Sequence, residues 1–226
     1  MKIYLDPPLK GEENMKRDLE LLQRSGVEQE VFLRLYSWQR PTISLGYFQK
    51  PEKVLNFKAL EKYRLDYVKR PTGGRAVFHF RELTYAIAIP NNYPNLPSGI
   101  TQAYRFISEP IYKAFISLGL SVKWARQEKN ATEACFLAPA RHEIIFNGHK
   151  LVGSAQRRTA NAVLQHGSIL LEAQPDLFAE CLLGIDKEAF IRQLRQRTMV
   201  IPVSAWDLKI QLAAEFRRLF QKERNS

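Results

Sequence analysis

The sequence predicts an α+β fold, in which a mixed, mostly antiparallel sheet is flanked by helices. Through most of the chain, apolar runs of strand length follow one another through hairpins and loops, without regular alternation with crossover helices. The last part instead repeats apolar residues at spacings of three and four, and Ser204 with Asp207 has the spacing of a capping box. We expect one domain over residues 1–226, with a helical C-terminal segment over about 175–226.

Apolar spacing and turn residues predict the elements of the first half. A first helix is predicted over residues 12–24, where Met15, Leu19 and Leu22 share one face. Pro51 suits the first turn of a short helix that reaches about residue 63. Four strands are predicted at the apolar runs around these helices: 31–38, 42–47, 67–70 and 83–89. The strands at 67–70 and 83–89 flank a Thr-Gly-Gly turn.

Three local features predict the elements of the second half of the chain: a helix cap, a proline and a turn. Thr101 is expected to cap the next helix, and Pro110 should kink or restart it. Asn147-Gly148 lies between two short strand-like runs and predicts a hairpin with a type I′ turn, because both residues accept a positive φ. The apolar run at residues 162–171 predicts a further strand.

Composition indicates a globular protein of ordinary size. The chain has 226 residues and is 45% hydrophobic, which is enough for a sizeable core. Its two cysteines are too few for a disulfide framework, so a reducing, cytoplasmic setting is expected. The N-terminus has no apolar stretch of signal-peptide length, and no run approaches the roughly 20 apolar residues of a membrane span. We therefore expect a cytoplasmic monomer without a membrane partner.

The charge balance predicts acidic partners. Lys and Arg number 34 against 23 Asp and Glu, which gives a net charge of +11. Such a charge favours nucleic acid, a membrane surface or an acidic protein. Single-strand binders interleave basic residues with exposed aromatic ones, and Arg157-Arg158 and Arg217-Arg218 lack that pattern. Nucleic acid is therefore not the expected partner.

The segment Arg-Pro-Thr-Gly-Gly-Arg at residues 70–75 is a first candidate for a binding site. Gly73 and Gly74 let a backbone approach a ligand closely and expose N–H groups. Arg70 and Arg75 would add donors for a phosphate or carboxylate. The segment is neither a Walker A loop nor a dinucleotide fingerprint, and a paired glycine on its own is most often a plain turn.

Cys135 and Lys150 are the candidates for reactive side chains. Cys135 lies in a polar, loop-like stretch, whereas Cys181 lies on the apolar side of a predicted helix and is interpreted as a core residue. Lys150 opens the return strand of the Asn-Gly hairpin among apolar and small neighbours. A lysine so placed can face a cleft, where desolvation favours its neutral form, although most strand lysines are solvated.

A glycine inside a predicted strand marks a further candidate for a binding site. His166 and Gly167 interrupt an apolar strand, where glycine indicates a bulge or the close approach of a ligand or a backbone. A metal site is not expected, because the histidines lack the tight pairing of zinc ligands: His79, His142, His149 and His166.

In combination, these segments resemble a known family. Residues 70–79, followed by Glu-Leu-Thr-Tyr at 82–85, resemble the signature loop of the biotin/lipoate A/B protein ligase superfamily. More narrowly, they resemble its cysteine-dependent octanoyltransferase branch. Further motifs of that branch follow in the expected order over about residues 10–175: Asn14-Met15 with Asp18, 35–49, 134–136, 148–156 and 164–168.

The resemblance implies the fold of the biotin/lipoate protein ligase catalytic domain and an acyl transfer. Such enzymes move an octanoyl chain from the thioester of acyl carrier protein to one lysine of a lipoyl domain or glycine-cleavage H protein, without ATP. Cys135 then matches the cysteine that is acylated, and Lys150 matches the lysine of the acyl site. Substrate-binding positions match in the loop and on the opposing strands: Arg70, Gly73, Gly74, Arg75, His79, Gly153, Ser154, Ala155, His166 and Gly167.

Departures from the family pattern keep alternatives open. Phe80 stands where many members have Asp, and Ala140 where octanoyltransferases commonly have Ser, so hydrogen bonds behind the site differ. Arg75 stands where ATP-dependent lipoate ligases more often carry a third glycine, which favours a transferase. The alternatives are octanoyl transfer between two lipoyl-carrier proteins, an ATP-dependent ligase, and a non-enzymatic nucleic-acid-binding module.

Overall fold

A five-stranded sheet forms the centre of the molecule. The computed structural model describes residues 1–125, 143–197 and 201–222. In the central sheet, the first two strands pair in parallel and all other neighbours are antiparallel. The order is β1 (Lys2–Leu5), β2 (Phe32–Tyr36), β6 (Glu82–Pro90), β11 (Ala162–Leu170) and β10 (Val152–Arg158). The structure thus confirms the predicted α+β class and the mostly antiparallel pairing.

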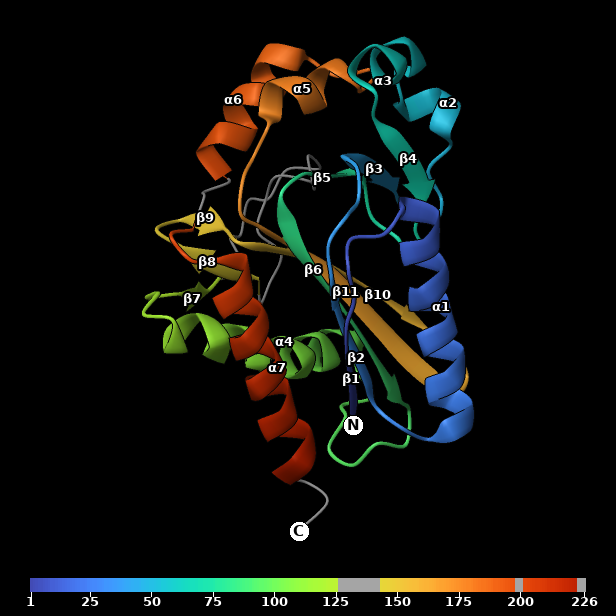
Figure 1. The fold of residues 1–226 in the computed structure, drawn as a ribbon, viewed down its shortest axis with the longest axis vertical. Helices are drawn as coiled ribbons and strands as arrows, with labels where there is room; N and C mark the ends of the chain where they lie inside the picture. The colour runs from blue at the N-terminus through green and yellow to red at the C-terminus, as the bar shows by residue number, and fades with distance from the viewer. Residues whose placement is uncertain (126–142, 198–200, 223–226) are drawn as a thin grey trace.

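Helices cover both faces of this sheet (Figure 1). α1 (Gly11–Glu28) packs on one face, and α4 (Ile100–Ser117) with α7 (Ala205–Lys222) packs on the other. Side chains alternate across the sheet because successive strand residues point to opposite faces. Even-numbered residues such as Tyr36 and Ala86 therefore contact the α1 side, whereas their odd-numbered neighbours join the core beneath α4 and α7.

Two smaller sheets complete the fold within the described ranges. One has the order β4 (Asp66–Lys69), β3 (Thr42–Leu45), β5 (Val77–His79), and the other β7 (Lys123–Trp124), β8 (Ile144–Phe146), β9 (His149–Lys150). Short helices lie together at the end of the molecule beyond the first of these sheets (Figure 1). They are α2 (Pro51–Val54), α3 (Phe57–Tyr63), α5 (Pro175–Glu180) and α6 (Lys187–Arg197).

Several local predictions are confirmed. Asn147 and Gly148 have φ of 49° and 81° and join β8 to β9, as a type I′ turn requires. The Ser204 hydroxyl accepts a hydrogen bond from the backbone N–H of Asp207 at 3.0 Å, at the start of α7. Cys181 is completely buried in the core under α5 and α6, as its apolar surroundings predicted.

Other local predictions were wrong. α4 begins at Ile100 with Gly99 at its cap position, so Thr101 is not the cap. The helix also continues through Pro110, where a kink or a restart was expected, so it does not restart there. Burial compensates for the lost hydrogen bond there, because the apolar stripe on both sides of the proline is buried against the sheet and α7. The helix predicted from Pro51 to residue 63 is two helices, since Asn56 caps a new one through its side chain.

In the part of the chain that the structure describes, no helix is both long and apolar enough to cross a bilayer.

Candidate active site

A cavity of about 390 Å³ lies between the central sheet, the start of α1 and the loop at 70–75. Its walls bring together most of the residues that the sequence singled out: Arg70, Gly74, Arg75, His79, Lys150, Gly153, Ser154, Ala155, His166 and Gly167. Gly73 belongs to the same loop but does not line the cavity. Cys135 and Ala140 lie outside the described residues.

Arg70 shapes the loop around this cavity. Its guanidinium donates to the carbonyl oxygens of Ser44 at 3.0 Å, Gly73 at 2.8 Å and Arg75 at 2.6 Å. Burial lowers the pKa of Arg70 to about 10. The sequence suggested Arg70 as a donor to an anionic ligand, but its hydrogen bonds go to the backbone of its own loop and to the carbonyl and hydroxyl oxygens of Ser44 on β3. The position of the loop therefore depends on Arg70.

Glycine is required where this loop meets the turn after β3. A Cβ atom built on Gly46 would lie 1.8 Å from the carbonyl oxygen of Gly74, and Gly74 itself has a φ of +93°. The backbone N–H of Tyr47 donates to the carbonyl oxygen of Thr72 at 2.9 Å. The two segments therefore pack backbone against backbone at the edge of the cavity.

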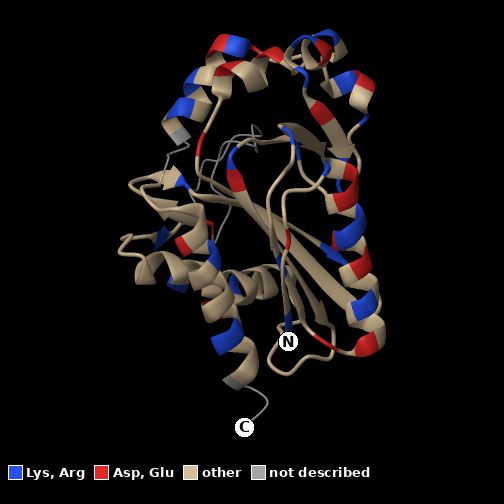
Figure 2. Ribbon diagram, in the orientation of Figure 1, with Lys and Arg blue, Asp and Glu red and all other residues tan. Residues whose placement is uncertain are grey.

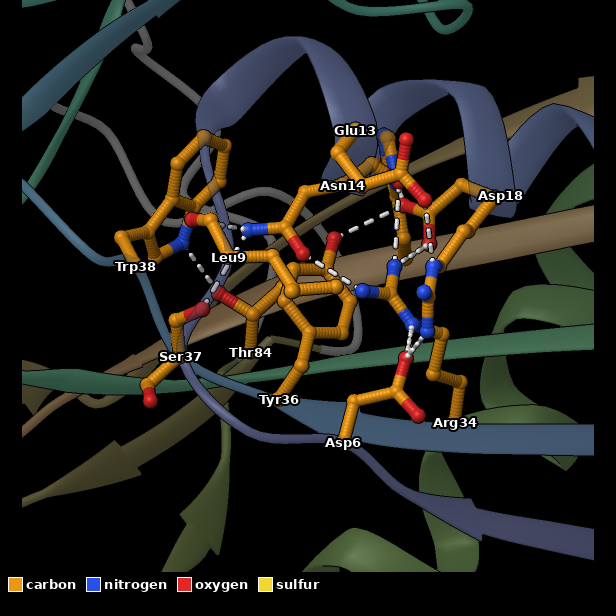
Figure 3. Close-up of polar contacts among 12 residues, drawn as sticks. Asp6, Leu9, Glu13, Asn14, Asp18, Arg34, Tyr36, Ser37, Trp38 and Thr84 are labelled. Atoms are coloured by element: carbon orange, nitrogen blue, oxygen red, sulfur yellow. Dashed lines mark hydrogen bonds and ion pairs between the residues drawn. The ribbon is translucent and has the colours of Figure 1, made fainter.

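His79 is held in a network of polar side chains. Its Nδ1 lies 2.9 Å from Glu82 Oε1, its Nε2 lies 2.7 Å from Ser44 Oγ, and its ring stacks on Trp38 with centroids 3.9 Å apart. Trp38 in turn donates to Thr84 and to Glu82 (Figure 3 shows Trp38 and Thr84). Glu82 thus supplies the carboxylate partner of His79, while Phe80 packs against Phe78.

A second network joins α1 to β2 through buried charges (Figure 3) and reaches the loop through His166. Asp18 is fully buried, accepts from Arg34 at 2.9 Å and from the Tyr36 hydroxyl at 2.8 Å, and lies 2.8 Å from His166 Nδ1. The other ring nitrogen of His166 lies 2.7 Å from the Thr72 hydroxyl. Burial, followed by the nearby Asp18 carboxylate, raises the pKa of Tyr36 well above its ordinary value, so Tyr36 remains a proton donor.

Lys150 stands between two cavities. It lines the one described above and a smaller, mainly apolar one of about 140 Å³, bounded by residues such as Val77, Phe78 and Phe178. Its Nζ lies 2.5 Å from Oε1 of Glu143, whose side chain is largely buried. The structure thus places Lys150 at a cleft, as one of the sequence interpretations expected. Among the described residues, no group of three or more His, Cys, Asp or Glu side chains is placed to hold a metal ion.

The cavity lies against β10 and β11, where small residues such as Gly153, Ala155 and Gly167 leave space for it. A Cβ atom on Gly167 would lie 2.5 Å from Ser154 Oγ and 2.8 Å from the carbonyl oxygen of Gly153. The Ser154 hydroxyl is 2.7 Å from the Tyr85 hydroxyl, and burial raises the pKa of Tyr85 to about 12. Only glycine fits at position 167.

The cavity is also lined by Tyr36, Trp38, Ser44 and Thr84, which are not among the predicted site residues. The available signal was that polar residues alternate with apolar ones inside strands that are otherwise core-like.

Sequence relatives share this chain's central region. An octanoyltransferase LipM from Halalkalibacterium halodurans is 44% identical over 153 residues, which are 64% of this chain and 55% of that protein. An octanoyltransferase LipM from Brevibacillus brevis is 37% identical over 216 residues, 89% of this chain and 78% of that protein. The matched region spans little more than half the length of several of the curated relatives.

Solved structures share the fold at low identity. A bipartite lipoate protein ligase from Thermoplasma acidophilum, described together with its E2 lipoyl domain, superposes with a TM-score of 0.74 at 18% identity, covering 98% of this chain and 84% of that one. A lipoate-protein ligase A bound with ATP gives a TM-score of 0.76 at 19% identity, covering 97% and 85%.

The lipoyl protein ligase A/B catalytic domain matches residues 10–209, which include every described residue of the cavity wall. The chain therefore belongs to the family of lipoyl protein ligase A/B catalytic domains, in its octanoyltransferase branch.

Proposed function

We propose that this chain transfers an octanoyl group from the thioester of acyl carrier protein to a lysine of a lipoyl domain or H protein, through an acyl-Cys135 intermediate. The names of its relatives support an octanoyltransferase, and the E2 lipoyl domain described together with an archaeal ligase supports the acceptor class. The observation that carries the proposal is the pairing of Lys150 with a cavity large enough for the acyl chain.

The larger cavity has room for that chain. A cavity needs about 10–15 Å³ of accessible volume for each water molecule that it holds, so eight carbon atoms of similar size need about 80–120 Å³. The cavity of about 390 Å³ exceeds this requirement. Met15, Tyr36 and Trp38 give the larger cavity carbon-rich surface for the chain.

The residues of the wall suit the chemistry of two successive acyl transfers. In the first, the Cys135 thiolate attacks the thioester carbonyl, a carbon–sulfur bond to Cys135 forms, and the carrier thiol leaves with a proton. In the second, the neutral acceptor lysine attacks the acyl-cysteine, an amide forms, the amine proton is released and the Cys135 thiol returns. The ammonium of Lys150, held by Glu143, polarises the carbonyl in both steps.

The test is to follow intact masses while the protein is mixed with octanoyl carrier protein and an apo lipoyl domain, without ATP. We expect an octanoyl adduct first on this protein and then on the lipoyl domain. Cys135→Ser should lose both adducts, while Cys181→Ser, which changes the buried cysteine of another core, should keep them. Acylation that needs free octanoate and ATP, or only octanoylated H protein as donor, would overturn the proposal.

A further inference from the structure

An exposed aromatic pair lies on the turn that follows β3. Tyr47 is 51% exposed and Phe48 is 86% exposed, and their rings meet edge to face with centroids 5.1 Å apart. Single exposed apolar residues are common on protein surfaces, but adjacent large aromatic side chains in contact with each other are characteristic of interaction sites.

Two cations from other elements converge on this pair. Lys69 Nζ, at the end of β4, lies 5.8 Å from the centre of the Tyr47 ring, and Arg157 Cζ, on β10, lies 5.6 Å from it. Neither cation forms an ion pair with a carboxylate in the part of the chain that the structure describes. We call Tyr47, Phe48, Lys69 and Arg157 the aromatic–basic surface.

This surface adjoins the loop that lines the larger cavity. The backbone of Tyr47 is hydrogen-bonded to Thr72, and Arg157 Nη1 donates to the carbonyl oxygen of Pro71 at 3.4 Å. Arg157 also follows Ala155 by two residues on β10, so its side chain leaves the strand on the face that Ala155 presents to the cavity. A protein bound on this surface would lie beside the entrance to the acyl chain's site.

We propose that the aromatic–basic surface docks the acceptor, a small acidic domain that presents its lysine on an exposed turn. This inference rests on the proposed function. A lysine stem spans only about 6 Å from Cα to nitrogen at ordinary bond lengths, so the acceptor's backbone must lie next to the cavity. A donor thioester is carried on a long, flexible prosthetic arm and needs no protein contact so close to the site.

Charge complementarity identifies the partner's chemistry. Carboxylates around the acceptor lysine would face Lys69 and Arg157, while apolar atoms would cover Tyr47 and Phe48. The net charge alone does not select a docking site, since acidic and basic residues are interspersed along the surface helices (Figure 2). The convergence of two cations on exposed aromatic rings does select one.

The experiment measures the two half-reactions separately. Phe48→Ser and Lys69→Glu variants are first acylated with octanoyl carrier protein, and the rate is read by mass. The acylated proteins are then mixed with increasing apo lipoyl domain in single turnovers. We expect self-acylation within about twofold of the unsubstituted protein, and an acceptor concentration for half-maximal transfer that is about tenfold higher.

Control variants and a charge swap complete the design. Trp206→Ser and Lys209→Glu make the same kinds of change on α7, on the other face of the central sheet, and should leave both half-reactions unchanged. A lipoyl domain in which a glutamate near its acceptor lysine is changed to lysine should restore transfer by Lys69→Glu. Unchanged acceptor dependence, or an equal loss of self-acylation, overturns the docking proposal. Absence of self-acylation in the unsubstituted protein overturns the proposed function instead.

Discussion

Asp18 on α1 and His166 on β11 lie 2.8 Å apart inside the protein, between a carboxylate oxygen and a ring nitrogen. Because Asp18 also accepts from Arg34 and Tyr36, its carboxylate is the acceptor of this contact and His166 Nδ1 is the donor. The other ring nitrogen lies 2.7 Å from the Thr72 hydroxyl, within hydrogen-bond distance. One buried carboxylate thus sets the orientation of a cavity residue and, through it, the loop that precedes Gly73.

Replacing Asp18 by asparagine should be strongly destabilising. The change leaves Arg34, which is almost fully buried, with Asp6 as its one remaining carboxylate among the described residues. Removing one partner of a buried ion pair costs about 3–5 kcal/mol of the free energy of unfolding, which urea denaturation measures. The control is Glu20→Gln on the same helix, where a half-exposed carboxylate should contribute less than about 0.5 kcal/mol. Equal effects of the two changes would contradict this role of Asp18.

Two glycines of the site should respond differently to alanine. Gly167→Ala places a methyl group against Ser154, Tyr85 and the backbone of Gly153, and should destabilise the fold by about 1–3 kcal/mol. Gly73→Ala meets no atom within 4 Å and should change stability by less than about 0.5 kcal/mol. Urea unfolding of both variants tests the pair. If Gly73→Ala lowers the free energy of unfolding as much as Gly167→Ala does, the loop around Gly73 packs more closely than the structure indicates.

The sequence predicts a structural feature best when the residues that determine it are close together in the chain. The Asn147-Gly148 turn and the Ser204 cap are determined by residues within a few positions of each other, and both were predicted correctly. The three-residue strand β5 was missed, because so short a strand has no periodicity of its own. The continuous helix through Pro110 depends on packing against α7, which is distant in the sequence.

The same rule applies to the cavity. Short motifs contain many of the residues that line it, because each motif is a short segment that lies along one wall. The partners of those residues are remote: Ser44 lies 26 positions from Arg70, and Asp18 lies 148 positions from His166. The sequence therefore assigned the Arg70 side chain to a ligand, whereas the fold uses it to hold the loop.

Burial of Cys181 makes stability depend on pH in the alkaline range. Burial raises the pKa of its thiol from 9.0 to about 11. A raised pKa in the folded state means that the stabilisation is fully present below pH 9 and is lost as pH rises through about 11. Two pKa units correspond to about 2.7 kcal/mol.

Comparison with Cys181→Ala isolates this effect, since every other titrating group is shared. The difference in free energy of unfolding between the two proteins should be constant below pH 9 and should shrink by about 2–3 kcal/mol between pH 9 and 11. Urea denaturation at a series of pH values measures it. A difference that stays constant to pH 11 would mean that the thiol ionises as readily in the folded as in the unfolded protein.

Glu143 should act on the reaction through Lys150. Its carboxylate lies 2.5 Å from the ammonium that faces both cavities, so it fixes where that charge stands relative to a bound carbonyl. Glu143→Gln keeps the shape and one acceptor but removes the charge that holds Lys150. We expect self-acylation from octanoyl carrier protein to slow by about 10- to 100-fold, because a misplaced catalytic group loses rate of this order. Rapid mixing with mass detection measures the rate of self-acylation.

Glu172→Gln is the matched control, since this carboxylate lines the smaller cavity but pairs with Arg81. Its rate should stay within about twofold, and similar losses in both variants would show that general charge near the cavities, rather than the hold on Lys150, governs the step.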